Sequence, residues 1–500
     1  MKKLLFVLSL LLTAALAAVT VLAALPIAAL PCEDGPIPAT GRPAAVRPQL
    51  GLADNVTLLH TSRGTVAVTE EASDDALAGT TRSGRTYDLY NGDRVAMGRL
   101  ETDRNLREPV LVHWRLEAQD AVLRWYDAEH AAWRETPLAA GTYRASCLTV
   151  TAGGGETMIY TPKVYDNLGS GTLRHWPELD GALEVCADGG GFTLGLTVPS
   201  MPAGSEAHWT VASSDTALLD WAGGTDGPYW ANYTLDGDSK WCFDGYYFPS
   251  PESYAPSGPD CYYRLPAAYL VKSFVYGGGS GVRAAEDLAV AALDTMARQQ
   301  NEAGYFPTLP ESQWLAESYG IGGGFYDTRF NTDLAEIFYK ASQWLRCREF
   351  DEAMGRYFDF FLAFAEDCHT ETAGGGWLVA DYGFGRETHT SLNHQLAEIL
   401  ALYHFSELLE REDLARLADR MLQAVRDTGG DWVRDDGDLH YGVFPDGSYG
   451  NPDYPYLTYN DLFQLQAYLT ERGRPEPVLD RLMAAKRAWM DTNGVTGYLR

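Results

Sequence analysis

The chain has 500 residues, which at roughly 150 residues per domain suggests about three structural units. Its 46% hydrophobic and 21% charged residues are ordinary for a globular protein and exclude disorder or a coiled coil over the whole length. The formal net charge of −29 repels nucleic-acid phosphates and anionic lipid headgroups, so we expect no nucleic-acid partner. The 29 Tyr and 13 Trp residues favour a carbohydrate ligand, because they offer flat apolar faces with a polar edge; core packing is the alternative.

The N-terminal segment, residues 1–31, is predicted to be a signal peptide or a signal anchor. Two lysines precede an uncharged run from Leu4 to Leu25, which as a helix nearly matches the ~30 Å hydrocarbon core of a bilayer. The small residues from Ala14 to Ala18 would instead allow cleavage. The flanking lysines predict an extracytoplasmic location for the rest of the chain, either membrane-anchored or secreted. Residues 32–50 are rich in proline and are predicted to form a stiff linker.

Cysteine usage agrees with export. Apart from Cys32, the chain has six cysteines, which allow three local disulfides in an oxidising compartment. Cys242 and Cys261 are the best candidate pair, because they bracket a loop rich in Tyr, Pro and Gly. Buried free thiols are the alternative interpretation.

The first half of the chain shows the pattern of antiparallel strands. Between Val56 and Val211, short runs of β-branched and aromatic residues are separated by Gly, Asp and Asn turns. We therefore predict a β-rich domain over residues 51–215, folded as a sandwich or a barrel and without a catalytic constellation. Representative runs are Val110–Trp114, Ala121–Tyr126, Met158–Tyr160 and Phe192–Val198.

After Trp221 apolar residues recur at helical spacing, as in the stripe from Leu334 to Leu345. Gly- and aromatic-rich segments follow every second helix, and the spacing from Trp377 to Trp432 suits one helical hairpin plus its loop. The predicted fold is thus multidomain α+β, with an α/α barrel (toroid) of helical hairpins over residues 216–500. Closure of the barrel would gather the aromatic loops at one rim.

Three of these loops carry most of the polar and aromatic side chains that suit binding or catalysis. They span residues 377–394, 438–444 and 453–460. Asn393 and Asn460 each lie in the first turn of a predicted helix, where Asn also commonly caps the backbone. The chain lacks a phosphate-binding glycine loop, a nucleophile elbow and zinc-binding histidine spacing, so we expect neither a metal nor an organic cofactor.

Two segments within residues 331–489 carry a family resemblance. The run Ser391–Tyr403 begins with Ser-Leu-Asn and ends in Leu-Tyr, and Asp453–Tyr454 is followed by Asn460 and a Leu-rich helix. These segments resemble the Leu-Asn-Gly helix and the Asp-Tyr, Asn-Gln-Leu pattern in the C-terminal α/α-barrel domain of the D-glucuronyl 5-epimerase family. The resemblance implies an enzyme that inverts carbon 5 of uronate residues in a polysaccharide.

In that family tyrosines are the acid/base groups, and the resemblance implies this catalytic role for Tyr454, Tyr382 and Tyr441. Inversion removes a proton α to the uronate carboxylate from one face and returns one to the other, so two acid/base groups are needed. An unperturbed Tyr has a pKa near ~10 and needs a shifted pKa or a coupled proton acceptor. His440 would assist Tyr441, and Asp453 would orient Tyr454.

The resemblance also implies how a uronate is held. The family has an Arg three residues beyond its counterpart of Tyr441, where this chain has Phe444. Arg386 or Arg329 would therefore have to bind the uronate carboxylate. The other candidate substrate-binding residues are Trp377, His440, Asn393 and Asn460.

Two further classes of function fit the same sequence. A glycoside hydrolase needs two carboxylates, about 5–5.5 Å apart for retention or ~6.5–9.5 Å for inversion. A polysaccharide lyase would use Tyr, His and Asn, whereas a non-catalytic, membrane-tethered protein would only bind the glycan. In each case a glycan is the expected partner, together with the membrane through the N-terminal segment. The candidate hydrolase carboxylates are Asp381, Glu387, Asp435, Asp436 and Asp438.

Overall fold

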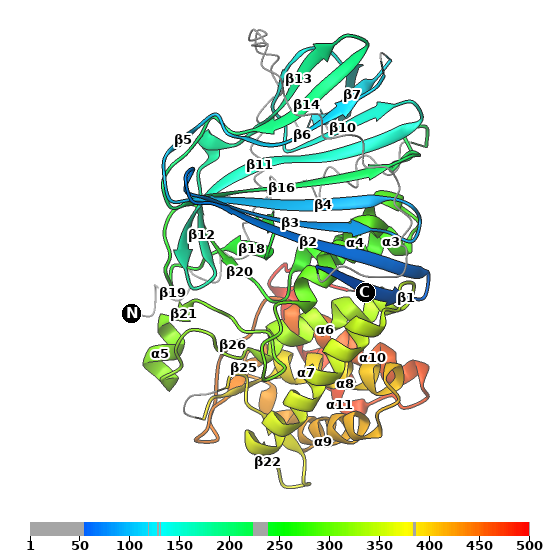
Figure 1. The fold of residues 1–500 in the computed structure, drawn as a ribbon. Coiled ribbons are helices and arrows are strands. Elements are labelled where there is room, and N and C mark those ends of the chain that lie inside the picture. Colours follow the sequence, from blue (N-terminus) through cyan, green and yellow to red (C-terminus); the bar gives the residue numbers. More distant parts are fainter. Residues whose placement is uncertain are drawn as a thin grey trace.

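The computed structural model describes residues 55–118, 120–127, 130, 132–223, 239–383 and 387–499. The predicted signal or anchor segment and the proline-rich linker lie outside these residues. Within the described part of the chain, no helix combines the length and the apolar character needed to cross a bilayer. A β-rich half packs against a helical half (Figure 1).

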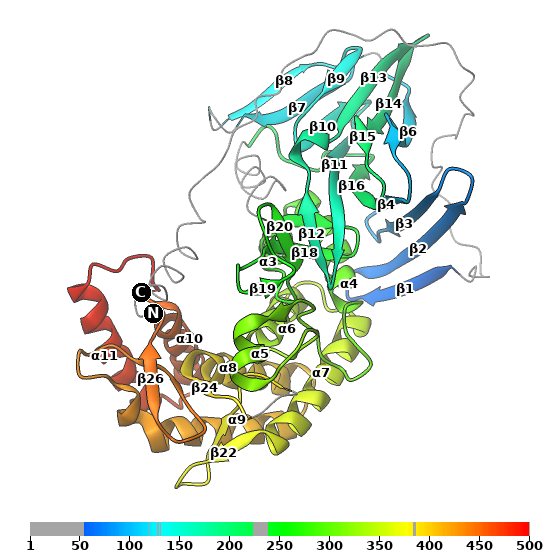
Figure 2. The ribbon, with the colours of Figure 1, turned by 90° about the vertical axis from the view of Figure 1, so that its left-hand side faces the viewer.

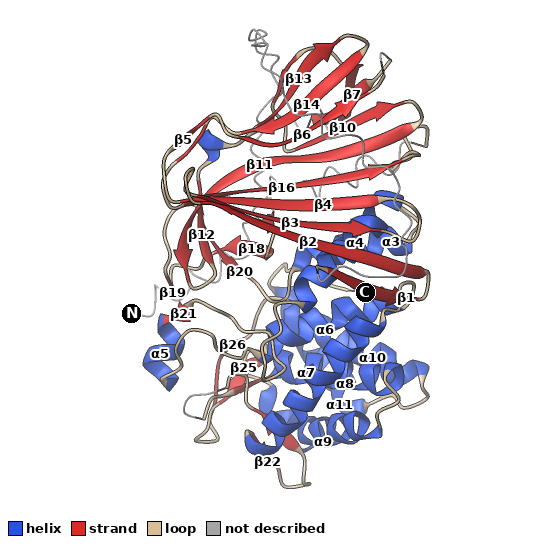
Figure 3. Cartoon of the chain, in the orientation of Figure 1, coloured by secondary structure: helices blue, strands red, loops and turns tan. Residues whose placement is uncertain are grey.

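Antiparallel strands form the first half (Figure 3). They are β1 Val56–Thr61, β2 Gly64–Asp75, β3 Thr80–Asp88, β4 Arg94–Thr102, β5 Leu106–Arg107, β6 Val110–Leu116, β7 Val122–Asp127, β8 Ala132–Pro137, β9 Gly141–Tyr143, β10 Cys147–Ala152, β11 Gly155–Gly169, β12 Thr172–His175, β13 Ala182–Asp188, β14 Gly191–Thr197, β15 Ser200–Met201, β16 Ser205–Ser214, β17 Lys240–Cys242, β18 Gly245–Pro249, β19 Tyr254–Ala255 and β20 Cys261–Arg264. The large sheet has the order β1-β2-β3-β4-β16-β11-β12-β20-β18-β17, with β10, β7 and β8 branching from β11. A second sheet has the order β6-β14-β13-β9.

The central strands of the large sheet bury side chains on both faces, since successive side chains of a strand point to opposite sides. On β11, Ile159 joins Leu183 and Leu194 of the second sheet in one hydrophobic core. Its neighbours Met158 and Tyr160 point the other way and join the core shared with the helices. The predicted strand runs and the sandwich of two sheets are confirmed.

Strands continue past residue 215, the expected end of the β-rich domain. β20, β18 and β17 extend the large sheet beyond β12, and the first α-helix among the described residues begins at Tyr269. Prolines and glycines interrupt the Tyr-rich runs of this stretch, so the sequence shows no clear strand signal there.

Cys242 and Cys261 are free thiols in this structure, so the expected disulfide between them is wrong. They lie on β17 and β20, and β18 runs between these two strands. Neighbouring strands are about 4.8 Å apart. Two such spacings exceed the Cα–Cα distance of at most ~6.8 Å that a disulfide usually spans.

In the part of the chain that the structure describes, four helical hairpins follow the sheets, and a short helix stands apart from them. The helices are α3 Tyr269–Gly279, α4 Arg283–Ala297, α5 Gln313–Tyr319, α6 Thr328–Ser342, α7 Arg348–Asp367, α8 Leu392–Leu408, α9 Glu412–Thr428, α10 Leu457–Glu471 and α11 Pro477–Thr492. The inner helices α3, α6, α8 and α10 pack side by side in that order, and α4, α7 and α9 flank them outside. The predicted helical hairpins are present.

The described hairpins form an open arc, not a full ring (Figure 2). Within the described residues, α10 at one end makes no extensive contact with α3 at the other. The first hairpin packs instead against the large sheet, where α4 contacts β4, β16 and β18. Tyr87 of β3 donates a hydrogen bond of 2.9 Å to Asp294 Oδ2 of α4. The large sheet thus covers a surface of the first hairpin that further hairpins would cover in a closed ring.

The loops after the second helix of the first three hairpins meet on one side of the arc, as predicted. They span residues 298–327, 368–391 and 429–456. Short strands join them, because β24 pairs with β25 and an isolated bridge links Asp327 to Tyr382. The short strands are β21 Glu311–Ser312, β22 His369–Glu371, β23 Trp377–Val379, β24 Thr390–Ser391, β25 His440–Val443 and β26 Tyr449–Pro452.

A buried carboxyl pair joins the sheet to the first hairpin. Asp93, after the turn between β3 and β4, and Asp287 in α4 are both almost fully buried. Asn91 Nδ2 donates to Asp287 Oδ1 at 2.8 Å, and Arg283 Nη2 donates to Asp93 Oδ1 at 2.8 Å. Burial and the adjacent charge of Asp93 raise the pKa of Asp287 well above its usual range. At neutral pH, Asp287 is therefore protonated in the folded protein and ionised in the unfolded chain.

We expect Asp287→Asn to leave stability unchanged near pH 4 and to stabilise the protein increasingly as the pH rises to 8. The folded-state pKa exceeds the unfolded value of ~3.9, so Asp287 lowers stability by up to ~1.4 kcal/mol per pH unit above that value. Asn resembles the protonated carboxyl and removes this loss. Urea unfolding at pH 4, 6 and 8 measures the difference, with the exposed Asp435→Asn as control. A difference that does not grow with pH would contradict the assignment.

Candidate active site

Tyrosine, histidine and aspartate side chains cluster where the three loops meet. Ring centroids of Tyr441 and Tyr454 lie 5.8 Å apart. The imidazole of His389 lies 5.9 Å from the ring of Tyr382 and 5.5 Å from that of Tyr441. Tyr454 is 41% exposed, and the other two tyrosines are half-buried. The structure therefore brings the three sequence-predicted tyrosines into one cluster, in which Tyr382 and Tyr441 contact His389 and Tyr454 contacts Tyr441.

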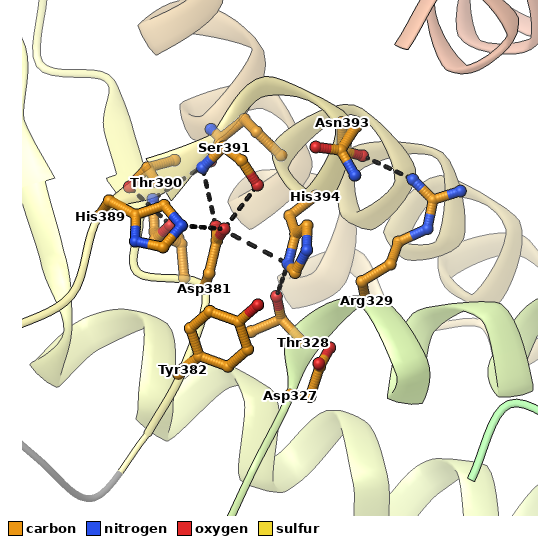
Figure 4. Close-up of polar contacts among 12 residues, drawn as sticks. Asp327, Thr328, Arg329, Asp381, Tyr382, His389, Thr390, Ser391, Asn393 and His394 are labelled. Atoms are coloured by element: carbon orange, nitrogen blue, oxygen red, sulfur yellow. Dashed lines mark hydrogen bonds and ion pairs between the residues drawn. The ribbon is translucent and has the colours of Figure 1, made fainter. Parts of the chain in front are cut away.

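Asp381 is the fixed centre of this cluster (Figure 4). The backbone N–H of Ser391 donates to its Oδ1 at 2.8 Å. His389 Nε2 lies 3.2 Å from Oδ2, and His394 Nδ1 lies 3.7 Å from Oδ1. Burial would raise the pKa of Asp381, but the two imidazoles and Ser391 outweigh it and lower that pKa. Asp381 thus remains a carboxylate close to both imidazoles, while the His394 ring is held by the Thr328 hydroxyl, 2.8 Å from its Nδ1.

His389 connects Asp381 to a fourth tyrosine that the sequence analysis did not single out. The hydroxyl of Tyr319, at the end of α5, lies 2.9 Å from His389 Nδ1. The phenol, the imidazole and the carboxylate thus lie in series, with the phenol against one imidazole nitrogen and Asp381 Oδ2 3.2 Å from the other. Nothing in the sequence near Tyr319 pointed to this arrangement, because its partners lie in the next loop.

Asp327 is a second group that the sequence analysis missed. It caps the N-terminus of α6, where its Oδ1 accepts a 2.9 Å hydrogen bond from the backbone N–H of Phe330. Burial, with a smaller contribution from the charge of Asp381, raises the pKa of Asp327 to about 7. A carboxyl that titrates near neutrality in a cluster of ionisable groups is suited to acid/base chemistry. In the sequence it was indistinguishable from an ordinary helix cap.

The phenols of the cluster are protonated at neutral pH. Burial raises the pKa of Tyr382, Tyr441 and Tyr454, and the charge of Asp327 raises each further. A phenol with a raised pKa is a ready proton donor. To accept a proton, it must first pass its own proton to a neighbouring base. His389 and Asp327 are the ionisable neighbours, and the two imidazole nitrogens face Tyr319 and Asp381.

Arg329 is held by the protein and is not free for a substrate carboxylate. Its Nη1 and Nη2 donate to Asp461 at 2.7 and 3.1 Å, and its Nε donates to Asp333 at 2.9 Å. Nη1 also donates to the backbone carbonyl of Asn393 at 3.0 Å. The structure therefore does not support uronate binding by Arg329. Arg386 lies outside the described residues, so its role stays a prediction.

His440 and Trp377 lie away from the tyrosine cluster. Neighbouring side chains alternate along β25, so His440 faces opposite to Tyr441, and its ring lies 5.8 Å from that of Tyr449. The indole of Trp377 stacks on His369 at 3.9 Å, between β22 and β23. Neither side chain can assist the tyrosines directly in this arrangement.

The two asparagines differ in their surroundings, and neither is a helix cap. Ser391 and Tyr456 occupy the N-cap positions of α8 and α10. Asn460 Oδ1 accepts a 2.9 Å hydrogen bond from the backbone N–H of Leu499, which ties down the C-terminal residues. Asn393 is buried, and its side-chain oxygen has no hydrogen-bond partner among the described residues. Asn393 thus remains a candidate substrate-binding residue.

A buried lysine fixes the loop that carries Tyr454. Lys486 of α11 is fully buried, and its Nζ donates to Asp438 Oδ1 at 2.6 Å and to the carbonyl oxygen of Tyr454 at 2.7 Å. Asp453 Oδ2 lies 2.8 Å from the same Nζ. Asp438 and Asp453 are therefore structural partners of Lys486.

Of the carboxylates considered for hydrolysis, Asp381 alone lies in the cluster as the structure describes it. Glu387, Asp435 and Asp436 are exposed, and Asp438 is bound to Lys486. Across the described ranges, no group of three or more His, Cys, Asp and Glu side chains is arranged to hold a metal ion.

No family model and no curated protein matches the sequence. Among solved structures, the chain is similar to a family 76 glycoside hydrolase from a bovine Bacteroides thetaiotaomicron strain, with 11% identity, a TM-score of 0.37, and coverage of 79% of this chain and 75% of that one. It is also similar to cellobiose 2-epimerase from Spirochaeta thermophila DSM 6192, with 17% identity, a TM-score of 0.34, and coverage of 46% and 59%.

Unsaturated glucuronyl hydrolase from Bacillus sp. GL1 is similar with 15% identity, a TM-score of 0.27, and coverage of 45% of this chain and 66% of that one. The match thus spans less than two thirds of the epimerase and of this hydrolase. At these values similarity assigns neither a fold family nor an activity. The molecule's own geometry defines a β-sandwich protein with an arc of helical hairpins and a tyrosine-rich site in the loops on one side.

Proposed function

We propose that the protein is a carbohydrate-active enzyme that inverts carbon 5 of uronate residues in a polysaccharide by tyrosine acid/base chemistry. One observation carries the proposal: Tyr382, Tyr441 and Tyr454 come from two different loops and lie in one cluster, in which Tyr382 and Tyr441 contact His389 and Tyr454 contacts Tyr441. Proton transfer at a ring carbon needs two such groups and no redox partner. The many exposed and half-exposed aromatic rings of the site also suit a sugar ligand.

In the proposed reaction one phenol passes its proton to His389 or Asp327 and then accepts the proton of carbon 5. The electron pair left by the broken C–H bond delocalises into the adjacent carboxylate. A second phenol donates its proton to the opposite face, which forms the new C–H bond and completes the inversion. The proton held by the base then returns, by exchange with solvent, to the phenolate left behind, so both phenols are restored. We assign the solvent-accessible Tyr454 and the adjacent Tyr441 to these two steps, with Tyr382 as the third member of the cluster.

The uronate carboxylate must find a partner other than Arg329. Asn393, whose side-chain oxygen lacks a partner among the described residues, can bind a sugar hydroxyl, and Arg386 remains the sequence-based choice for the carboxylate. The N-terminal segment of the sequence supports a reaction outside the cytoplasm, on a glycan of the cell exterior.

The proposal is tested by incubating the full chain with oligosaccharides of alternating glucuronate and N-acetylglucosamine. Nuclear magnetic resonance should show the carbon 5 epimer appearing until a constant ratio is reached, from either epimer as starting material. Neutral oligosaccharides of equal length serve as the control. Unchanged uronates together with cleaved chains would contradict an epimerase.

The opposite pKa shifts of the Asp327 and Asp381 carboxyl groups favour a glycoside hydrolase as the second candidate function. Asp327 has its pKa raised to about 7, whereas Asp381 has its pKa lowered. A general acid and a carboxylate base are separated in this way in hydrolase sites. The full burial of Asp381 argues against direct contact with a sugar.

The pH dependence of Asp327 separates the two candidates. As a proton acceptor, Asp327 must be ionised, so activity should rise with pH through about 7. As the general acid of a hydrolase it must be protonated, so activity should fall over the same range. Asp327→Asn keeps the helix cap and should remove this dependence together with ~10²-fold or more of the rate. The exposed Glu387→Gln is the matched control, and a pH dependence that survives in Asp327→Asn would exclude this role.

A further inference from the structure

We propose that Trp314 is an aromatic platform that binds a sugar residue next to the reacting one, so that the substrate is an oligosaccharide chain and not a free monosaccharide. The inference rests on the proposed function and names a binding site within it. It places the extended part of the glycan on the α5 side of the tyrosine cluster.

Helix α5 is a firm support for this side chain. Its N-cap Ser312 accepts a 3.4 Å hydrogen bond from the backbone N–H of Leu315, and β21 pairs Ser312 with Tyr254 of β19. Leu315 and Ile321 are buried in a small core with Phe325. The helix ends at Gly320, whose φ of +72° favours glycine. The backbone of Trp314 is thus held in place while its indole remains outside this core.

Trp314 is 44% exposed although it touches the cluster. Its ring centroid lies 5.7 Å from His389, 5.8 Å from Tyr319 and 6.2 Å from Tyr382, each in an edge-to-face arrangement. Within the residues that the structure describes, no hydrogen bond of the indole N–H is found. A flat apolar ring with a free polar edge is the kind of surface that stacks on a sugar and bonds its hydroxyl.

The ring contacts continue from Trp314 across the site. From Trp314 the series passes to His389 at 5.7 Å, to Tyr441 at a further 5.5 Å, and to Tyr454 at a further 5.8 Å. This series joins α5 to the loop before α10. A single sugar held at Tyr441 and Tyr454 would leave Trp314 uncovered, whereas a longer chain would cover both.

The test measures glycan binding in a Tyr454→Phe background, so that the ligand is not converted. The probes are glucuronate–N-acetylglucosamine oligosaccharides of two, four and six sugars, titrated calorimetrically. Trp314→Ala should weaken binding of the hexasaccharide about tenfold, because an aromatic stacking contact is worth about 1 kcal/mol or slightly more. Disaccharide binding should change little, and Trp314→Phe should retain most of the affinity.

Tyr276→Ala is the matched control, because Tyr276 is 47% exposed on α3 and makes no side-chain contact with the cluster. Hexasaccharide affinity unchanged in Trp314→Ala would overturn the platform while leaving the proposed function intact. An equal loss for all three lengths would also overturn it, since Trp314 would then hold the reacting sugar. Absence of binding by every variant, together with absence of carbon 5 inversion in the wild type, would reject the proposed function itself.

Discussion

Tyr454→Phe is expected to slow carbon 5 inversion by ~10²–10⁴-fold, the usual contribution of a general acid or base. The substitution keeps the ring and its contact with Tyr441 but removes the hydroxyl that carries the proton. Because Tyr454 is 41% exposed, loss of the hydroxyl should leave the unfolding transition nearly unchanged. Initial rates of epimer formation and a urea unfolding curve measure the two effects separately.

The control for this prediction is Tyr456→Phe. Tyr456 lies in the same loop, at the N-cap of α10, and has no contact with the three site tyrosines in the described structure. It should keep a rate within a few-fold of the parent. Equal rates for Tyr454→Phe and Tyr456→Phe would remove Tyr454 from the chemistry and leave stacking on the sugar as its role.

Lys486→Met is expected to lower the free energy of unfolding by about 3–5 kcal/mol, the cost of leaving buried charges without their partner. Both Asp438 and Asp453 are buried and depend on the same ammonium group. The variant also frees the carbonyl oxygen of Tyr454, so its residual folded fraction should be less active. Urea unfolding at pH 7 measures the loss.

Two further variants make the Lys486 result specific. Combining Lys486→Met with Asp438→Asn and Asp453→Asn removes all three charges and should recover part of the lost stability. The exposed Lys272→Met on α3 should change it by less than ~0.5 kcal/mol. A loss below ~1 kcal/mol in Lys486→Met, or no recovery in the triple variant, would contradict the ion cluster as a determinant of stability.

Local periodicity was enough to predict the two halves and the meeting of the loops. The stripe that contains Leu334, Ile337 and Phe338 is buried on α6, and the alternating run around Ile159 lies in the middle of the large sheet. These signals are local, since each depends on residues within one helix or strand. The resemblance also located three tyrosines that the structure brings together.

Long-range contacts account for what the sequence did not show. Arg329 looked free for a substrate, but its guanidinium is held by Asp461, which is 132 positions away in the chain. Tyr319 belongs to the site because its hydroxyl contacts His389, which is 70 positions away in the chain. Because β20 pairs with β12, the large sheet continues past residue 215, and the first α-helix among the described residues begins at Tyr269. None of these partners has a periodic or motif-like signature.

The most direct test of the tyrosine acid/base site is the mass of a uronate oligosaccharide recovered after incubation with the wild-type chain in heavy water. Because a proton leaves carbon 5 and another returns from solvent-exchanged phenols, each converted uronate should gain one deuterium while the chain keeps its length. Shortened chains would indicate hydrolysis, and chains shortened with an unsaturated end would indicate lysis. An unlabelled oligosaccharide of unchanged length would contradict proton transfer at carbon 5 by this site.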